Sequence, residues 1–369
     1  MVECTSPFAI TSMFIFSTCQ VGAETVLKKE ATRKFPDMRS AFARPGFVSF
    51  KTQTLPVDFA ERSVFARIAA VSLGKIETNQ FDQLATEVWN IAAEHHLFVN
   101  RVHVFGRDPL PPGQHDFEPH IPAAMVQLHR QIIEQSPKAK FLGAGADNIF
   151  QPAQSGETIL DVVHIEPNLF FVGAHTVTET LPIHSRYSGG ILPITLPLDV
   201  VSRAYLKFHE GLLWSGITLG IGDRCLDIGA SPGGCSQFLL SQGVKVLGVD
   251  PGEIHPLVLT HSHFTHIRNR IKDTKRSLFR DVQWITADMN VAPNYTLDVL
   301  EEAVAKAAGS VRGLLFSLKL PRWELADKLP MLHDRIRKWG FTDVRMKQLV
   351  FNRQEVMVAA RVEKDYVVR

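Results

Sequence analysis

The sequence predicts an α/β protein in which a Rossmann-like domain follows an α+β region. Residues 225–234 form an apolar strand that runs through a small-residue turn into a helix. Beyond residue 200, apolar strands alternate with helical segments, and Gly243, Gly309 and Gly340 stand where a helix should stop before a strand. This alternation is typical of a parallel sheet with helices on both faces.

In the amino-terminal region the sequence signal for helices and strands is weaker, and both types are expected. We expect residues 1–185 to form the α+β region, residues 186–200 a linker, and residues 201–369 the Rossmann-like domain. A Pro-rich stretch at 108–119 reads as a loop. The expected strands and helices of this region are 9–17, 22–35, 46–51, 64–73, 81–95, 98–105, 122–135, 158–166 and 169–175.

The carboxy-terminal elements follow in regular order. The last two strands lack an intervening helix, so we expect an antiparallel pair at the end of the sheet. The expected helices are 234–242, 297–308 and 323–339, and the expected strands after the first are 244–249, 282–287, 313–318, 341–345 and 351–362.

The turn at residues 229–234 predicts a nucleoside ligand. Glycine lets the main chain approach a ligand closely, and Asp250 ends the next strand, sixteen residues beyond Gly234. A carboxylate at that position accepts hydrogen bonds from ribose hydroxyls. An ordinary strand–turn–helix corner is the alternative interpretation.

The same turn disfavours phosphate-bearing cofactors. Ser231 stands where a dinucleotide fingerprint has glycine, and Cys235 replaces the lysine of a phosphate-binding loop. Pro232 also removes a backbone donor. A ligand without phosphates fits better, and S-adenosylmethionine is the common one.

Four charged residues are candidates for catalysis. Lys207 lies in a helix before the first strand, Asp288 and Lys319 end apolar strands, and Glu355 lies in the last strand. The carboxyl ends of parallel strands share one rim, so these groups should converge near Gly229 and Asp250. Taken singly, each is more often a surface ion-pair partner.

Such a cluster suits methyl transfer to a ribose hydroxyl. The protein must align the displacement and remove the hydroxyl proton. We expect Lys319 to be the base, with its pKa lowered by the Lys207 ammonium and by desolvation. Asp288 and Glu355 would position the two ammonium groups.

These motifs resemble the FtsJ-type ribose 2′-O-methyltransferases, and among them the RlmM type, which modifies a cytidine ribose in bacterial 23S rRNA. The resemblance spans residues 165–362. It implies an S-adenosylmethionine-dependent methyltransferase domain, preceded by a ferredoxin-like and THUMP-like RNA-binding region. The matching strings are Ser-Arg-x-x-Leu-Lys at 202–207, Ser-Pro-Gly-Gly at 231–234, Gly-Val-Asp at 248–250, Asp-Met at 288–289, Leu-Lys-Leu-Pro at 318–321 and Arg-Gln-Glu-Val at 353–356.

Residue roles follow from this resemblance. Lys207, Asp288, Lys319 and Glu355 form the catalytic tetrad, with Lys319 as the catalytic residue. The sequence departs from the family at 267–270, Ile-Arg-Asn-Arg, where Asn269 replaces the acidic residue that holds the adenine amine, and at Ala204, where the family has serine. The candidate cofactor-binding residues are Asp227, Gly229, Ser231, Pro232, Gly233, Gly234, Asp250 and Asp288.

Composition excludes several classes of protein. With 369 residues, 45% hydrophobic, the chain has room for two cores, and it contains no apolar run of about 18 residues that would span a membrane. The apolar start carries Glu3 and no early basic residue, which argues against an export signal. The four cysteines show no metal spacing. We expect a cytoplasmic monomer with reduced thiols, and neither a membrane nor DNA as its partner.

Charge is distributed unevenly along the chain. From Val201 onward there are 24 Lys and Arg against 18 Asp and Glu, so this half is basic while the chain as a whole carries only +2. The excess concentrates at 268–280, which is either a solvated loop or an edge that contacts RNA phosphates. The histidines at 255, 261, 263 and 266 lack the accompanying ligands of a zinc site.

Two functions remain open from the sequence. The first is ribose 2′-O-methylation of a structured RNA, 23S rRNA or its precursor. The second is a non-catalytic RNA-binding or ribosome assembly factor that retains the methyltransferase fold.

Overall fold

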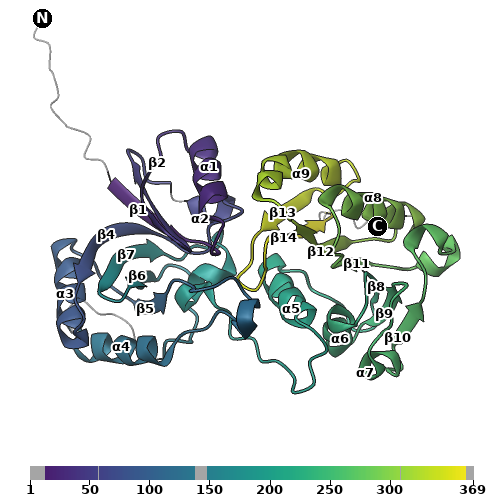
Figure 1. Ribbon diagram of the computed structural model, residues 1–369, viewed down its shortest axis with the longest axis horizontal. Coiled ribbons are helices and arrows are strands. Elements are labelled where there is room, and N and C mark those ends of the chain that lie inside the picture. The colour runs from purple at the N-terminus through teal and green to yellow at the C-terminus, as the bar shows by residue number, and fades with distance from the viewer. Residues whose placement is uncertain (1–12, 57, 138–147, 308, 363–369) are drawn as a thin grey trace, which may run out of the picture. The chain divides into compact units, whose positions relative to one another are not determined.

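The computed structural model describes residues 13–56, 58–137, 148–307 and 309–362. The chain divides into two compact units, Met1–Ile191 and Leu192–Arg369, called unit 1 and unit 2 below. Unit 1 is purple to teal in Figure 1, and unit 2 is teal to yellow.

Unit 1 is built on a seven-stranded sheet in the order β2-β3-β1-β4-β7-β6-β5. Only β5 and β6 pair in parallel; the other neighbours are antiparallel. The strands are β1 Met13–Thr18, β2 Arg39–Arg44, β3 Phe47–Thr52, β4 Ala69–Glu77, β5 Arg101–Gly106, β6 Thr158–Glu166 and β7 Leu169–Thr176.

The helices of unit 1 are α1 Glu24–Lys34, α2 Phe59–Arg62, α3 Phe81–Glu94 and α4 Ala123–Glu134. Helices α3 and α4 share an apolar core with the sheet, and Trp89 Nε1 donates to the carbonyl of Ile132 at 2.7 Å between them. One strand was not expected, and another begins later than expected. Residues 39–44 form strand β2, which has no period-2 apolar pattern because its side chains are exposed or only half-buried. Strand β4 begins at Ala69 rather than residue 64. Expected strand residues 9–12 lie outside the described residues.

Unit 2 has the predicted α/β sheet, in the order β10-β9-β8-β11-β12-β14-β13. Strands β8 to β12 pair in parallel, and β14 is antiparallel to both β12 and β13, which confirms the expected closing pair. The strands are β8 Arg224–Ile228, β9 Lys245–Val249, β10 Phe264–Ile267, β11 Trp284–Ala287, β12 Gly313–Lys319, β13 Asp343–Lys347 and β14 Glu355–Arg361.

Helices cover both faces of this sheet. Figure 1 shows α5 and α6 on one side and α8 and α9 on the other. Gly243, Gly309 and Gly340 have φ values of 77°, 84° and 101°, which confirms their left-handed positions after helices. The helices are α5 Ala204–Ser215, α6 Gly234–Ser241, α7 Pro256–Leu259, α8 Pro293–Lys306 and α9 Leu329–Arg337.

One predicted helix is divided. Residues 323–339 form a 3₁₀ segment, Trp323–Lys328, followed by α9. Pro330 lies in the first turn of α9, where its missing N–H costs nothing, so a new helix starts there.

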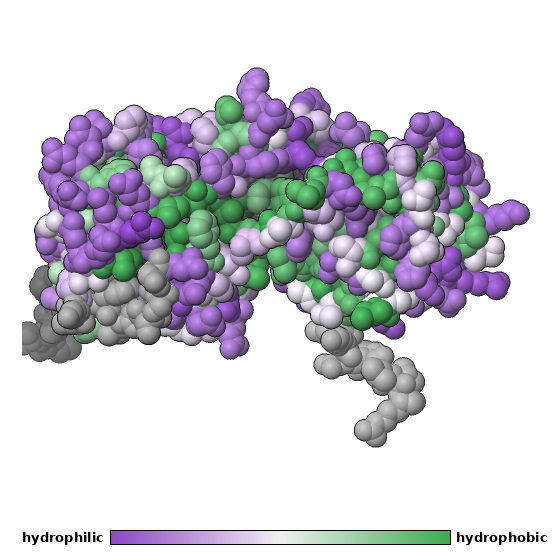
Figure 2. All heavy atoms as spheres, turned by 90° about the horizontal axis from the view of Figure 1, so that it is seen from below, coloured by the Kyte–Doolittle hydropathy of each residue, from purple (hydrophilic) through white to green (hydrophobic). Residues whose placement is uncertain are grey.

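The surface, the cysteines and the helices have the following properties. The face drawn in Figure 2 mixes hydrophilic residues with patches of hydrophobic ones. The described cysteines, Cys19, Cys225 and Cys235, are buried free thiols. The described helices include none with the length and hydrophobicity needed to cross a bilayer.

Candidate active site

The four predicted catalytic residues meet at one point of unit 2. Lys207 Nζ lies 2.5 Å from Asp288 Oδ2 and 3.2 Å from Glu355 Oε1. Lys319 Nζ lies 2.7 Å from Asp288 Oδ1 and also contacts Glu355 Oε2. Each carboxylate therefore bridges the two ammonium groups, and the four side chains form a closed ring.

Sheet topology explains this convergence. Asp288 directly follows β11, and Lys319 ends the adjacent parallel strand β12, so both lie at the carboxyl rim. Lys319 and Glu355 are register partners across the antiparallel pair β12–β14. Lys207 reaches the same point from α5, which packs against β12 and β14.

The ring is largely hidden from solvent. The side chains of Lys207 and Glu355 are 7% and 3% exposed, and those of Asp288 and Lys319 are 13% and 19% exposed. Two positive and two negative charges compensate one another, which is the condition under which charges can be buried. Lys319 is the most exposed of the four side chains.

The pKa of Lys319 differs from the expectation. Desolvation does lower it, but Asp288 and Glu355 outweigh that effect, and the pKa is raised well above its ordinary value. The expected lowering by Lys207 was wrong, because two carboxylates stand between the two ammonium groups. Burial acts to raise the pKa of Asp288, yet Lys207 and Lys319 hold it well below its usual range. In the resting structure Lys319 is thus an ammonium group and a hydrogen-bond donor.

A cavity of about 450 Å³ lies directly beside this ring. The residues from the glycine-rich turn and from the ring line it together, so a ligand held by the turn would lie next to Lys319. The cavity is lined by Gly229, Ser231, Pro232 and Gly234 of the turn, by Lys207, Asp288, Lys319 and Glu355 of the ring, and also by Ser202, Arg203, Ala204, Asn290 and Arg353.

The glycines of the turn are there because no side chain fits. Gly229 has φ +75°, and a Cβ on it would lie 2.8 Å from Met289 Cγ. A Cβ on Gly234 would lie 2.1 Å from Ser202 Oγ. At these glycines the main chain packs closely against its neighbours. A cofactor that binds against bare main chain requires such a turn.

Two predicted cofactor residues have structural partners. Asp250 directly follows β9 and accepts from the backbone N–H groups of Ser231 (3.2 Å) and Gly252 (2.6 Å), which fixes the turn. Asp227 is 1% exposed and does not line the cavity. Its carboxylate accepts from the hydroxyls of Ser236 (2.6 Å) and Thr286 (2.9 Å), and burial raises its pKa to about 6. Gly233 (φ +125°) is the N-cap of α6.

Other sequence candidates lie away from the ring. Asn269 Oδ1 accepts from the Arg270 N–H at 3.0 Å, so its acceptor already has a partner. His255 Nδ1 accepts from the Leu257 N–H at 3.3 Å and begins α7. Within the described residues, no group of three His, Cys, Asp or Glu side chains is placed to hold a metal ion.

Sequence reasoning missed the residues that fix Glu355. Glu210, on α5 one turn beyond Lys207, is fully buried and accepts from the N–H groups of Val350 (2.8 Å) and Phe351 (3.0 Å). Arg203 Nη2 donates to the Phe351 carbonyl at 3.2 Å. The helix that carries Lys207 thus also holds the loop that leads to Glu355. The only sequence signal was a second charged residue, three positions after Lys207, in a mostly apolar helix.

Known proteins are similar in sequence to the part of the chain that carries this site. Residues 200–330 match the FtsJ-like methyltransferase family. Unit 2 carries an FtsJ-like methyltransferase domain.

Curated relatives of the FtsJ-like domain carry the name Ribosomal RNA large subunit methyltransferase M. The protein from Laribacter hongkongensis (strain HLHK9) is 32% identical over 183 residues, 46% of this chain and 50% of that protein. The one from Azoarcus sp. (strain BH72) is 28% identical over 185 residues, 47% and 50% of the two chains. The chain thus spans about half the length of the curated relatives it matches, and the resemblance to the RlmM type is confirmed over that part.

A solved structure, TrmN from Thermus thermophilus, aligns with 95% of this chain and 100% of its own at 14% identity and a TM-score of 0.36. This similarity is too weak to bear on the activity of the FtsJ-like domain.

Proposed function

We propose that the protein is an S-adenosylmethionine-dependent ribose 2′-O-methyltransferase that acts on 23S rRNA or its precursor. The observation that carries the proposal is the closed ring of Lys207, Asp288, Lys319 and Glu355 beside a cavity walled by bare backbone. The names of the curated relatives support a large-subunit rRNA substrate.

The residues that line the cavity are suited to hold S-adenosylmethionine. S-adenosylmethionine would supply an electrophilic methyl carbon. The turn Ser231–Gly234 and Gly229 would hold it, with Asp250 keeping the turn in place and Asp288 at the reacting end. The glycine-rich turn itself carries no lysine or arginine that could bind a phosphate.

Lys319 must lose a proton before it can accept one. Its ammonium donates to Asp288 and Glu355, and the two lysines hold the pKa of Asp288 well below its usual range, which leaves Glu355 as the acceptor. We propose that a proton passes from Lys319 to Glu355, and that the resulting amine accepts the ribose hydroxyl proton as the oxygen attacks. Lys207 contacts both carboxylates and holds them in position.

Unit 1 is assigned the RNA-binding role only by the resemblance to a THUMP-like region. Its sheet order and core neither require nor exclude that role, so the assignment stays a prediction. We propose that it captures the RNA while unit 2 carries out the reaction.

Replacing Lys319 tests the proposed function. Incorporation of tritiated methyl groups into unmodified 23S rRNA should fall by about 10²–10⁴-fold in Lys319→Ala, the usual contribution of a general acid–base group. Lys328→Ala, which removes an exposed lysine of unit 2, is the matched control and should retain activity.

Other results have clear meanings. Equal incorporation by Lys319→Ala and the parent would remove Lys319 from the mechanism. No incorporation by the parent, together with tight binding to the rRNA, would favour the non-catalytic assembly factor instead.

A further inference from the structure

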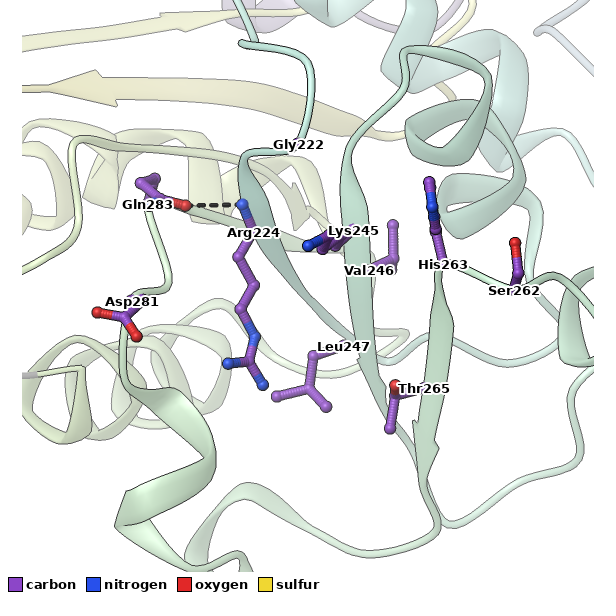
Figure 3. Close-up of a pocket in the computed structure, with 10 residues that line it drawn as sticks. All are labelled: Gly222, Arg224, Lys245, Val246, Leu247, Ser262, His263, Thr265, Asp281 and Gln283. Atoms are coloured by element: carbon purple, nitrogen blue, oxygen red, sulfur yellow. Dashed lines mark hydrogen bonds between the residues drawn. The ribbon is translucent and has the colours of Figure 1, made fainter.

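A row of basic residues crosses the sheet of unit 2 at the end opposite the ring. Arg224 begins β8, and its register partner Lys245 begins β9. His263 directly precedes Phe264, the register partner of Val246, so it continues the same row on β10. Figure 3 shows the three side chains on three adjacent strands.

The three side chains share one face of the sheet. Asp227 faces α6, because it accepts from Ser236 of that helix. Side chains alternate along a strand, so Arg224, three residues earlier, faces the other way. Its register partner Lys245 has the same orientation. The row therefore lies on the face that α6 leaves uncovered.

This row lines a hollow of about 440 Å³. Hydroxyl groups of Ser262 and Thr265 stand beside the basic groups, and the floor includes Leu247 (Figure 3). Asp281 is the acidic residue among those that line it, so the hollow has an excess of positive charge.

The row is costly unless an anion neutralises it. Neighbouring strands lie about 4.8 Å apart, and like charges placed in register repel. Lys245 is exposed, and its side-chain ammonium makes no hydrogen bond or ion pair with the described residues. Arg224 uses Nη1 to hold the Arg280 carbonyl at 3.2 Å, and no carboxylate within the described residues forms an ion pair with it.

The connection between β10 and β11 contributes two residues to the wall of the hollow. Asp281 and Gln283 come from the end of that connection, and Gln283 Oε1 accepts from the Arg224 N–H at 2.6 Å. Lys275 and Arg276 in the same connection are exposed. RNA is a long polyanion, so it offers phosphates both to the row and to these exposed cations.

We propose that Arg224, Lys245 and His263 form a second RNA site, which binds backbone phosphates at the amino end of the sheet. Along the strand direction, the five-residue strands β8 and β9 place the row about 13 Å from the carboxyl rim on which the ring lies. The ring is also displaced sideways onto β11, β12 and β14, so the row contacts a part of the RNA other than the target nucleotide. This inference rests on the proposed RNA substrate. Such contacts would position a structured RNA without reading its sequence.

Salt-dependent binding tests the site directly. The probe is an unmodified 23S rRNA transcript, and its affinity is measured between about 50 and 200 mM salt, where released counterions dominate. Arg224→Gln and Lys245→Gln should each weaken binding about tenfold near 100 mM salt and reduce the slope of log K against log salt by about 1. In the double variant, the slope of log K against log salt should fall by about 2.

Controls separate this site from the active site. Lys338→Gln removes an exposed charge from the same unit, after α9, and should leave the slope unchanged. Lys245→Arg keeps the positive charge, so it should have the same slope of log K against log salt as the parent. Calorimetric binding of S-adenosylmethionine and the thermal unfolding temperature should match the parent in all variants.

The two proposals fail in different ways. If the parent methylates the transcript and the double variant has the same slope as Lys338→Gln, the second site is refuted while the enzymatic function stands. If the parent binds RNA without methylating it, and the double variant loses slope, the site stands and the enzymatic function fails. A parent that does not bind the transcript overturns both.

Discussion

Lys319 Nζ lies 2.7 Å from Asp288 Oδ1 across the carboxyl ends of two neighbouring parallel strands. Ser317 donates to the same oxygen at 2.5 Å, so Asp288 is held from two directions on β12. This pair, together with Glu355, decides the protonation state from which the proposed reaction begins.

The pH dependence of the reaction should show no titration of Lys319 near neutrality. Asp288 and Glu355 raise the pKa of Lys319 above its ordinary value, against desolvation, so the ammonium persists throughout the range from about pH 6 to 9. We expect kcat/KM for rRNA to stay level across that range. A tenfold rise per pH unit that ends in a plateau would show a free amine as base and contradict the proton path through Glu355.

Glu355→Gln should slow methyl transfer without loosening the cofactor. The amide keeps the size of the side chain but cannot take a proton from Lys319, so kcat should fall by at least about 10²-fold. The dissociation constant of S-adenosylmethionine, measured by calorimetry, should stay within a few-fold of the parent value. Glu324→Gln, an exposed isosteric change, serves as the control. A normal kcat in Glu355→Gln would exclude Glu355 as proton acceptor.

Glu210 should affect both stability and the reaction, because it positions the loop before Glu355. Glu210→Ala leaves two buried N–H groups without their acceptor, which costs about 2–4 kcal/mol of unfolding free energy. Glu210→Gln retains one acceptor oxygen and should lose less. Urea denaturation gives the stabilities.

The conservative variant isolates the positioning effect. In Glu210→Gln we expect kcat to fall while KM for S-adenosylmethionine is unchanged, since the turn at 229–234 is not held by Glu210. A fall in stability with unchanged kcat would mean that Glu210 only supports the fold.

Asp227 should make the protein less stable as the pH rises. Burial raises its pKa from 3.8 to about 6, so the folded chain binds the proton more tightly than the unfolded chain. Stability from this group is complete below about pH 4 and is lost by about pH 7, a change of about 3 kcal/mol. Asp227→Asn does not titrate, so its unfolding free energy relative to the parent should rise by that amount between pH 4 and 7. Urea denaturation at several pH values checks this, and a constant difference would refute it.

Local sequence determined much of this protein. The strand–turn–helix at 225–234 depends on neighbouring residues, because glycine and proline restrict the backbone wherever they stand. Asp288 and Lys319 could be assigned to one rim because each ends an apolar strand of a parallel sheet. Strand β2 was missed for the converse reason, since its exposed side chains leave no periodic apolar signal.

Only the tertiary structure decided the electrostatics and the long-range contacts. The direction of the Lys319 pKa depends on which charges touch it, and two carboxylates lie closer to it than Lys207 does. Asp227 does not line the cavity, because side chains alternate along β8 and this one points toward α6. Glu210, and the row of Arg224 and Lys245, depend on which segments pack together and in what register. Contacts between residues so distant along the chain are fixed by the packing of the whole domain, which no short stretch of sequence encodes.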